Sequence, residues 1–329
     1  MYFSEYMNEW LYGEDGYYKT FKDIGKDGDF YTAVSTSRFF GASIANYFYD
    51  LIKQNIADRN GYLIEIGAHK GYLICDMIEW LYSLDSSLIG TLKFAIVERQ
   101  EEVKKSQIEY IKSRLGDDFV IEHFDDVSQI NVDYAFVVSN EIFDAFSCEL
   151  YKDKKIAKVD NNQIEWIDAP KEILDFASSH NLTKGEIAVG YEEFAKDLSK
   201  GIKKCDFVSF DYGEKYVRND FSIRIYQSHK TLPLFDEELN LKESFKNDDI
   251  TYDVNFNHIS QAFSKANFKE IKYLTQAKAL IEFGLIDILS QFSKITTQNI
   301  YQREADKIKT LIAPTMMGDR FKMVHFRSI

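Results

Sequence analysis

The sequence is poor in several features that define other classes of protein. Its 329 residues include only three cysteines and three prolines. Cys75, Cys148 and Cys205 lie in apolar stretches without C-x-x-C spacing, which is typical of buried thiols in a reducing compartment. No apolar run approaches the roughly 20 residues of a membrane-spanning helix, and the N-terminus lacks the basic and apolar segments of a signal peptide. We therefore expect a soluble, cytoplasmic protein without membrane insertion.

Basic residues are also in the minority. Lys and Arg number 40 against 53 Asp and Glu, which gives a formal net charge of −13. Because no basic stripe accompanies this excess of acid, a nucleic acid is not an expected partner, whereas a basic protein substrate would be tolerated. The six histidines show no metal-ligand spacing, so we predict no metal. The sequence also has no G-x-S-x-G motif and thus no support for serine hydrolase chemistry.

The most informative stretch is GYLIEIGAHKGYLICDMIEW, residues 61–80. An apolar run meets a loop with glycines and is followed at once by an amphipathic run, which predicts a strand, a tight turn and a helix. Such a turn presents backbone N–H groups to a ligand. A second apolar strand, LKFAIVE, ends in Glu98, and a carboxylate at this place suits the two hydroxyls of a ribose. The unit therefore predicts a nucleoside-binding site.

The loop itself discriminates between nucleosides. Gly67 and Gly71 are its only glycines, whereas a dinucleotide fingerprint needs G-x-G-x-x-G, so a nicotinamide dehydrogenase is a poor interpretation. The loop is closer to the E-x-G-x-G-x-G pattern of S-adenosylmethionine-dependent methyltransferases, beginning at Glu65 and with His69 as the central residue. A non-glycine residue with positive φ costs roughly 1 kcal/mol, which histidine tolerates better than most types. A plain strand–helix turn, in a fold that has lost its ligand, is the alternative.

Strand and helix patterns alternate through the middle of the chain. Strands are expected at 62–66, 92–98, 119–124, 132–141 and 205–213, and the helices between them at 72–84 and 100–115. This alternation predicts an α/β fold with a doubly wound, Rossmann-like parallel sheet. We assign it to residues 58–215, with a β-hairpin insertion at 148–168 that turns at Asp160-Asn161-Asn162.

The flanking segments read differently. Residues 1–57 are expected to form an N-terminal helical and loop lid whose second helix runs from about Ser37 to Lys53. Residues 216–329 are expected to form a helical, substrate-side elaboration. Residues 214–255 are predicted to be polar and irregular. Helices are expected to follow at 257–266, 276–293 and 298–311, and the last predicted element is the strand RFKMVHF.

Ordered strings along nearly the whole chain resemble the motifs of one family, the MidA-like S-adenosylmethionine-dependent methyltransferases. GDFYTAVSTSRFFG (28–41) resembles the family's GDFxTSPEISxxFG, EIGAHKG its E-[IL]-G-P-G-R-G, and SNEIFDAF (139–146) its NEFFDALP. FDYG, DITYDVNF and LIAPTMMGDRFKMVHF are similar to further family strings. The resemblance implies a class I methyltransferase sheet, S-adenosyl-L-methionine as the cofactor and a protein arginine as the methyl acceptor. Mitochondrial members assist complex I assembly, which makes a respiratory-complex subunit a candidate substrate.

Some family residues are replaced. Pro-Gly-Arg of the cofactor loop is Ala68-His69-Lys70, and the Pro-Glu after GDFxTS is Val34-Ser35, which removes a carboxylate near the expected mouth of the site. The arginine-rich segment after DYG keeps mainly Arg224 and His229. These departures favour the rival hypothesis, a catalytically silent methyltransferase fold that serves as an assembly scaffold. The sequence indicates no oligomeric state.

The expected cofactor contacts lie in three places: in residues 28–41, called the GDF segment below, in the glycine loop at 65–71, and at the ends of the following strands. They are Gly28, Asp29, Phe30, Thr32, Glu65, Gly67, His69, Gly71, Glu98 and Asp126. The GDF segment would form a lid over the cofactor, or else simply start a helix that is capped by Thr36 or Ser37. Glu65 would accept from the cofactor's amino group, fix the loop through backbone N–H groups, or both. Glu98 is a ribose acceptor or a solvated carboxylate, and Asp126 an adenine acceptor or a turn cap.

The candidate catalytic residues are Asn140, Glu141 and Asp144. They follow the fourth core strand, at the carboxyl edge where open α/β sheets bind their ligands. Glu141 would hold a guanidinium through paired, charge-assisted hydrogen bonds and so fix the attacking nitrogen. Methyl transfer needs in-line positioning and electrostatic matching more than acid–base chemistry. The alternative is an acid at a helix N-terminus beside a core Phe143.

Overall fold

The computed structural model describes residues 1–19, 32–227 and 230–329. The chain folds into two compact units, each built from separate stretches of sequence. The sheet unit comprises residues 31–142, 194–212 and 263–329, and the accessory unit comprises residues 1–30, 143–193 and 213–262. The functional segments 1–57, 58–215 and 216–329 stay a prediction, because they divide the chain by expected role rather than by compactness.

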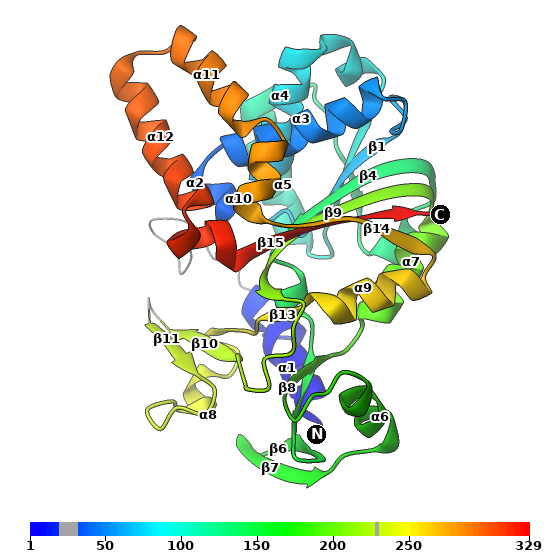
Figure 1. Ribbon diagram of the computed structural model, residues 1–329, viewed down its shortest axis with the longest axis vertical. Coiled ribbons are helices and arrows are strands. Elements are labelled where there is room, and N and C mark those ends of the chain that lie inside the picture. Colours follow the sequence, from blue (N-terminus) through cyan, green and yellow to red (C-terminus); the bar gives the residue numbers. More distant parts are fainter. Residues whose placement is uncertain (20–31, 228–229) are drawn as a thin grey trace. The chain divides into compact units, whose positions relative to one another are not determined.

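The sheet unit contains a mostly parallel sheet with the strand order β14-β15-β9-β4-β1-β2-β3 (Figure 1). The strands are β1 (Tyr62–Ile66), β2 (Lys93–Val97), β3 (Glu122–Phe124), β4 (Val132–Asn140), β9 (Ile202–Glu214), β14 (Phe268–Thr275) and β15 (Phe321–Ser328). Strands β1, β2, β3, β4 and β9 pair in parallel, whereas β15 runs antiparallel to both β9 and β14. The predicted doubly wound, Rossmann-like α/β class is confirmed.

Helices cover both faces of this sheet. The sheet unit contains α2 (Ala33–Thr36), α3 (Phe39–Lys53), α4 (Tyr72–Leu84), α5 (Glu101–Leu115), α10 (Gln276–Glu282), α11 (Leu285–Ile295) and α12 (Gln298–Ile312). It also contains α7 (Tyr191–Gly201) from residue 194 onward and the end of α9 (Phe256–Lys265) from residue 263 onward. On one face Phe40 of α3 packs with its ring centroid 4.9 Å from that of Phe210 in β9. Phe207 points to the other face, because side chains alternate along a strand, and there its ring lies 5.1 Å from that of Phe263 in α9.

Two features of the C-terminal part differ from the sequence prediction. The single helix expected at 276–293 is divided at Gly284, which has φ +90° and precedes α11. Asn46 stabilises the break, because its Nδ2 donates to the carbonyl oxygen of Phe283 at 2.9 Å. In addition, residues 268–275 form β14, which pairs along its length with β15.

The accessory unit contains a four-stranded antiparallel sheet with the order β7-β6-β5-β8. Its strands are β5 (Cys148–Lys152), β6 (Lys155–Asp160), β7 (Gln163–Asp168) and β8 (Lys184–Ala188), and α1 (Phe3–Tyr12) and α6 (Lys171–Ser179) belong to the same unit. The predicted hairpin is confirmed, since Asn161 and Asn162 connect β6 and β7 with positive φ at both residues. A second two-residue turn at Asp153 and Lys154, also with positive φ, extends the hairpin to β5.

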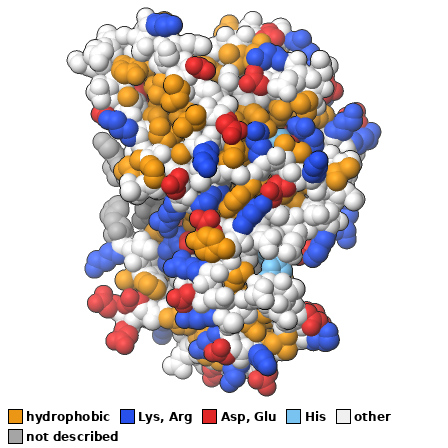
Figure 2. All heavy atoms as spheres, viewed as in Figure 1, with side chains coloured by type: hydrophobic (Ala, Val, Ile, Leu, Met, Phe, Trp, Pro, Cys, Tyr) orange, Lys and Arg blue, Asp and Glu red, His pale blue; other side chains and the backbone are white. Residues whose placement is uncertain are grey.

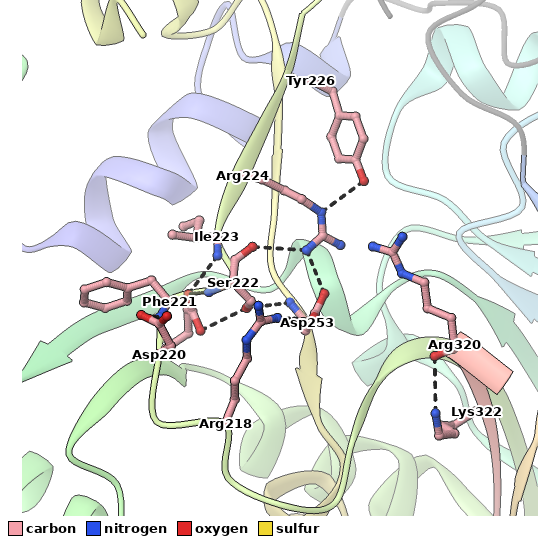
Figure 3. Close-up of polar contacts among 11 residues, drawn as sticks. Arg218, Asp220, Phe221, Ser222, Ile223, Arg224, Tyr226, Asp253, Arg320 and Lys322 are labelled. Carbon is pink, nitrogen blue, oxygen red and sulfur yellow. Dashed lines mark hydrogen bonds and ion pairs between the residues drawn. The ribbon is translucent and has the colours of Figure 1, made fainter. Parts of the chain in front are cut away.

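The expectation of irregular structure at 214–255 is wrong. A second small sheet forms there from β10 (Arg224–Gln227), β11 (Lys230–Pro233) and β12 (Asp249–Thr251), together with α8 (Leu241–Ser244) and β13 (Val254–Asn255). The guanidinium of Arg224 is buried and orders the segment (Figure 3). It donates to Asp253 Oδ1 at 2.6 Å and to the Ser222 carbonyl oxygen and Tyr226 Oη, both at 3.1 Å. His229 lies outside the described residues.

The surface carries charges of both signs. On the face shown in Figure 2, acidic and basic side chains alternate over short distances. The excess of acid is therefore not gathered into one stripe on this face. Among the residues that the structure describes, no helix combines the length and the apolar character needed to cross a membrane.

Candidate functional site

The predicted nucleoside site lies at the point where the strand order reverses. From β1 the chain proceeds outward through β2 and β3 and then returns to the opposite side of β1 as β4. Open α/β sheets bind ligands at the carboxyl ends of the strands that flank such a point. Ile66 pairs with Val97 on one side and with Ser139 on the other, so Gly67, Glu98 and Asn140 are the next residues of three adjacent strands. The structure thus brings these three predicted residues to one edge.

The loop after β1 has a left-handed residue at every second position. Gly67, His69 and Gly71 have φ of +72°, +47° and +85°. His69 is the first central residue of a turn that is closed by a hydrogen bond from Gly71 N–H to the Ala68 carbonyl oxygen at 2.6 Å. Positive φ at this turn position normally favours glycine. The backbone therefore has the conformation that the E-x-G-x-G-x-G pattern requires, although one of its residues is a histidine.

The space above Gly67 suits the close approach of a ligand. Gly67 is exposed, and apart from its two chain neighbours a Cβ atom added to it would meet only one described atom within 4 Å, Ile142 Cγ2 at 3.0 Å. No atom of His69 lies that close to it. The imidazole is instead on the side of Tyr72, with the ring centroids 6.5 Å apart. The histidine thus leaves open the approach to Gly67 that the predicted cofactor needs.

Glu65 is buried next to this loop and contacts the helix that follows it. Its side chain is only 3% exposed, and its Oε2 accepts a hydrogen bond of 2.9 Å from the backbone N–H of Ile74 in the first turn of α4. Burial raises the pKa of Glu65 to about 8; the Ile74 hydrogen bond opposes this shift, and the charge of Asp76 adds to it. Of the two roles expected for Glu65, this contact supports the fixing of the loop. Contact with the cofactor's amino group stays a prediction.

Replacing Glu65 with glutamine should make the stability less dependent on pH. Because the pKa of Glu65 is higher in the folded protein than in the unfolded chain, stability is lost as the pH rises from about 5 to about 8. We expect the difference in the free energy of unfolding, Glu65→Gln minus wild type, to increase by up to about 1.4 kcal/mol for each pH unit in this window. Urea unfolding of both proteins at several pH values across the window measures this difference. The exposed Glu102→Gln is the control, and parallel profiles for wild type and Glu65→Gln would contradict the prediction.

Glu98 and Asp126 lie at the next strand ends. Glu98 is partly buried, burial raises its pKa, and its Oε1 accepts from the backbone N–H of Gln100 at 2.9 Å. Asp126 is exposed, and its Oδ1 accepts from the backbone N–H and the hydroxyl of Ser128 at 2.9 and 2.7 Å. This is the turn-capping role considered for Asp126. Contacts of the two carboxylates with ribose and adenine stay predictions.

The lid predicted from the GDF segment is described only from Thr32 onward. Thr32 caps α2, since its Oγ1 accepts from the backbone N–H of Ser35 at 3.2 Å. Of the two caps expected in the alternative, Thr36 is the last residue of α2, whereas the Oγ of Ser37 accepts from the backbone N–H of Phe39, the first residue of α3, at 3.3 Å. Gly28, Asp29 and Phe30 lie outside the described residues. Closure over a cofactor therefore stays a prediction.

Asn140 and Glu141 form a polar pair at the end of β4. Asn140 Nδ2 donates to Glu141 Oε1 at 2.7 Å, and the backbone N–H of Glu141 donates to the Phe210 carbonyl oxygen of β9 at 2.8 Å. Glu141 has a φ of +54°, a conformation that costs a non-glycine residue roughly 1 kcal/mol. Asn140 Oδ1 is buried and accepts no hydrogen bond from the described residues. A strained residue beside an unused acceptor at the ligand-binding edge indicates a functional site.

Asp144, the third predicted catalytic residue, belongs to the accessory unit. It lies in a 3₁₀ turn, Phe143–Ala145, and is 5% exposed. Its surroundings in that unit are aromatic. Burial is the main cause that raises the pKa values of the Tyr18 and Tyr252 phenols, and the charge of Asp144 makes a smaller contribution in the same direction. The catalytic role expected for Asp144 stays a prediction.

Two further residues of the site are not predictable from the sequence patterns. Ile142 borders Gly67, and Gln107 of α5 donates from Nε2 to the carbonyl oxygen of His69 at 2.8 Å. A single apolar residue after a strand and a single glutamine in a polar helix carry no motif. Only the tertiary contacts reveal them.

Solved structures of other proteins are similar to this chain in fold. A crystal structure from Burkholderia thailandensis bound to S-adenosyl-homocysteine superposes with a TM-score of 0.81 and 22% identity, covering 99% of this chain and 87% of that one. A native crystal structure from the same organism gives a TM-score of 0.78, 21% identity and the same coverage. These likenesses show a shared fold. No curated protein matches the sequence.

A family assignment comes from the sequence itself. Residues 43–274, well over half of the chain, match the model of the family described as "Putative S-adenosyl-L-methionine-dependent methyltransferase". This stretch includes the loop from Glu65 to Gly71 and the Asn140–Glu141 pair. The protein therefore belongs to this family of S-adenosyl-L-methionine-dependent methyltransferases, whose cofactor is the one that the loop pattern predicts.

Proposed function

We propose that this protein transfers a methyl group from S-adenosyl-L-methionine to an arginine side chain of a protein. The observation that carries the proposal is the Asn140–Glu141 pair at the carboxyl edge of β4, one strand away from the glycine loop. The similarity of SNEIFDAF to the NEFFDALP string of the MidA-like family, whose members include arginine methyltransferases, supports the same acceptor.

The residues that would hold the cofactor follow from the geometry of the edge. Gly67 would admit the methionine end, because no side chain of its own blocks the approach. Glu98 would accept from the ribose hydroxyls, and Asp126 from the adenine amino group. When bound, S-adenosyl-L-methionine supplies an electrophilic methyl group on a positively charged sulfur. Glu65 would keep the loop in place through its bond to Ile74.

The residues that would hold the acceptor match a guanidinium. A carboxylate binds this planar cation through charge-assisted hydrogen bonds, and Glu141 presents one at the edge. Asn140 Oδ1 offers a neutral acceptor beside it, while Asn140 Nδ2 fixes the orientation of the Glu141 carboxylate. Holding the acceptor nitrogen in line with the methyl group supplies most of the acceleration such a transfer needs. The negative charge of Glu141 would also offset the positive charge brought by the substrate.

The test is transfer of a labelled methyl group to peptides. Purified protein, labelled S-adenosyl-L-methionine and basic peptides that carry arginine should give labelled arginine, and the same peptides with lysine in place of arginine should stay unlabelled. Cell extract in place of peptides would reveal the protein substrate, with respiratory-complex subunits as candidates. Calorimetry with S-adenosyl-L-methionine distinguishes an active enzyme from the rival hypothesis of a catalytically silent scaffold. The absence of both a heat of binding and a labelled polypeptide would support the scaffold.

A further inference from the structure

We propose that Gln107 is the positioning residue that lets histidine replace glycine at position 69 of the cofactor loop. Its side-chain amide would hold the His69 peptide in the left-handed conformation that the loop requires. The inference rests on the proposed function in one respect: the loop must serve to bind S-adenosyl-L-methionine.

Gln107 connects three elements of the sheet unit. It lies on α5 and is fully buried. Its Nε2 donates to the carbonyl oxygen of His69 at 2.8 Å, and its Oε1 is 2.9 Å from Nε2 of His123 in β3. A carbonyl oxygen can only accept, so the amide nitrogen must face His69 and the amide oxygen must face His123. His123 then donates from Nε2, and a continuous chain of hydrogen bonds runs from β3 through α5 to the loop.

The energies of the two effects are of similar size. A histidine in the left-handed region is strained relative to glycine. A buried hydrogen bond between neutral groups stabilises by an amount of the same order. Gln107 therefore offsets what His69 costs. The same bond fixes the direction of the His69 carbonyl and with it the peptide that leads to Lys70 and Gly71. A loop with glycine at this position would depend on Gln107 much less.

A double-mutant cycle tests the inference. The four proteins are the wild type, Gln107→Met, His69→Gly and the double variant. Methionine has about the same length as glutamine but neither donates nor accepts strongly. We expect Gln107→Met to weaken the binding of S-adenosyl-homocysteine by about 3- to 10-fold in the wild type and by less than about 2-fold in the His69→Gly protein. The His123 donor loses its acceptor equally in both backgrounds, so this effect cancels.

Gln276→Met is the matched control. Gln276 is also fully buried, and its Nε2 donates to a backbone carbonyl oxygen, that of Leu311, at 2.9 Å. Its loss should lower the unfolding midpoint without changing the affinity for S-adenosyl-homocysteine.

The outcomes separate this inference from the proposed function. Equal losses of affinity in both backgrounds would overturn the role of Gln107, since a merely structural residue does not distinguish histidine from glycine at position 69. No loss in either background would overturn it as well. If the wild type binds no S-adenosyl-homocysteine, the proposed function fails. The unfolding midpoints of the same four proteins then decide about Gln107, which should matter more beside His69 than in the His69→Gly protein.

Discussion

Glu141→Gln should slow methyl transfer to arginine by about a hundredfold and leave the affinity for S-adenosyl-homocysteine unchanged. Hydrogen bonds to charged groups contribute about 1.5–3 kcal/mol each, so the loss of a charge-assisted contact in the transition state accounts for roughly this factor. Glutamine would keep the Oε1 acceptor for Asn140 Nδ2 and turn its own NH₂ group towards the guanidinium. Two donors would then face each other where an ion pair is required.

Initial rates with a saturating cofactor concentration, together with calorimetry, measure both quantities. Asp133→Asn is the matched control, because Asp133 lies at the opposite end of the same strand and forms an exposed ion pair with Lys203 at 2.6 Å. It should change neither quantity, since such pairs contribute little. An unchanged rate in Glu141→Gln would refute the guanidinium assignment. A loss of cofactor affinity that matches the loss of rate would place Glu141 in the cofactor site instead.

The two polar positions of the edge share one physical property. Glu141 and His69 are non-glycine residues with positive φ, and the backbone of each forms a hydrogen bond with a neighbouring element. The N–H of Glu141 donates to the Phe210 carbonyl oxygen of β9, and the carbonyl oxygen of His69 accepts from Gln107. Residues in sparsely populated backbone regions persist where the surroundings determine them, and they gather at functional sites. The rest of the sheet thus holds the edge in a shape that the local sequence alone would not adopt.

Much of this arrangement follows from local patterns in the sequence. The strand at 62–66 and the helix at 72–84 are predicted with the bounds that the structure has. This is because the residues before Gly67 form a continuous apolar run, whereas the apolar residues after Gly71 recur with helical spacing. The positive φ of His69 follows from the spacing of the same loop. The site residues Gly67, Glu98 and Asn140 could be placed at one edge because the ends of parallel strands align.

The remaining parts depend on contacts between segments far apart in the sequence. The sheet of β10, β11 and β12 is made of short strands, and the buried Arg224 of β10 donates to Asp253, which is distant in the sequence. A polar, aromatic stretch gives no periodic signal for such a sheet. The break before α11 depends on Asn46, more than two hundred residues away. Gln107 has the polar appearance of a solvated helix face although it is fully buried.

Gly67→Val should reduce the affinity for S-adenosyl-homocysteine by at least about a hundredfold, or about 2.7 kcal/mol. Two effects combine. A β-branched residue at φ +72° adopts a conformation that costs about 1–2 kcal/mol, so the loop would shift towards an extended backbone. If the loop stays in place, the Cβ atom lies 3.0 Å from Ile142 Cγ2, and the added methyl groups extend into space above the glycine that no described residue fills. Either response removes the surface that the cofactor approaches.

Gly116→Val is the control for strain alone, because Gly116 ends α5 with φ +105° and a Cβ atom there meets no described atom within 4 Å. It should lower the unfolding midpoint and leave binding intact. Gly67→Ala is the milder variant for the case that Gly67→Val does not fold, and it should weaken binding by an intermediate factor. Calorimetry with S-adenosyl-homocysteine measures all three variants. Wild-type affinity in a folded Gly67→Val protein would mean that the cofactor does not approach the carboxyl end of β1, and the site would have to be sought elsewhere.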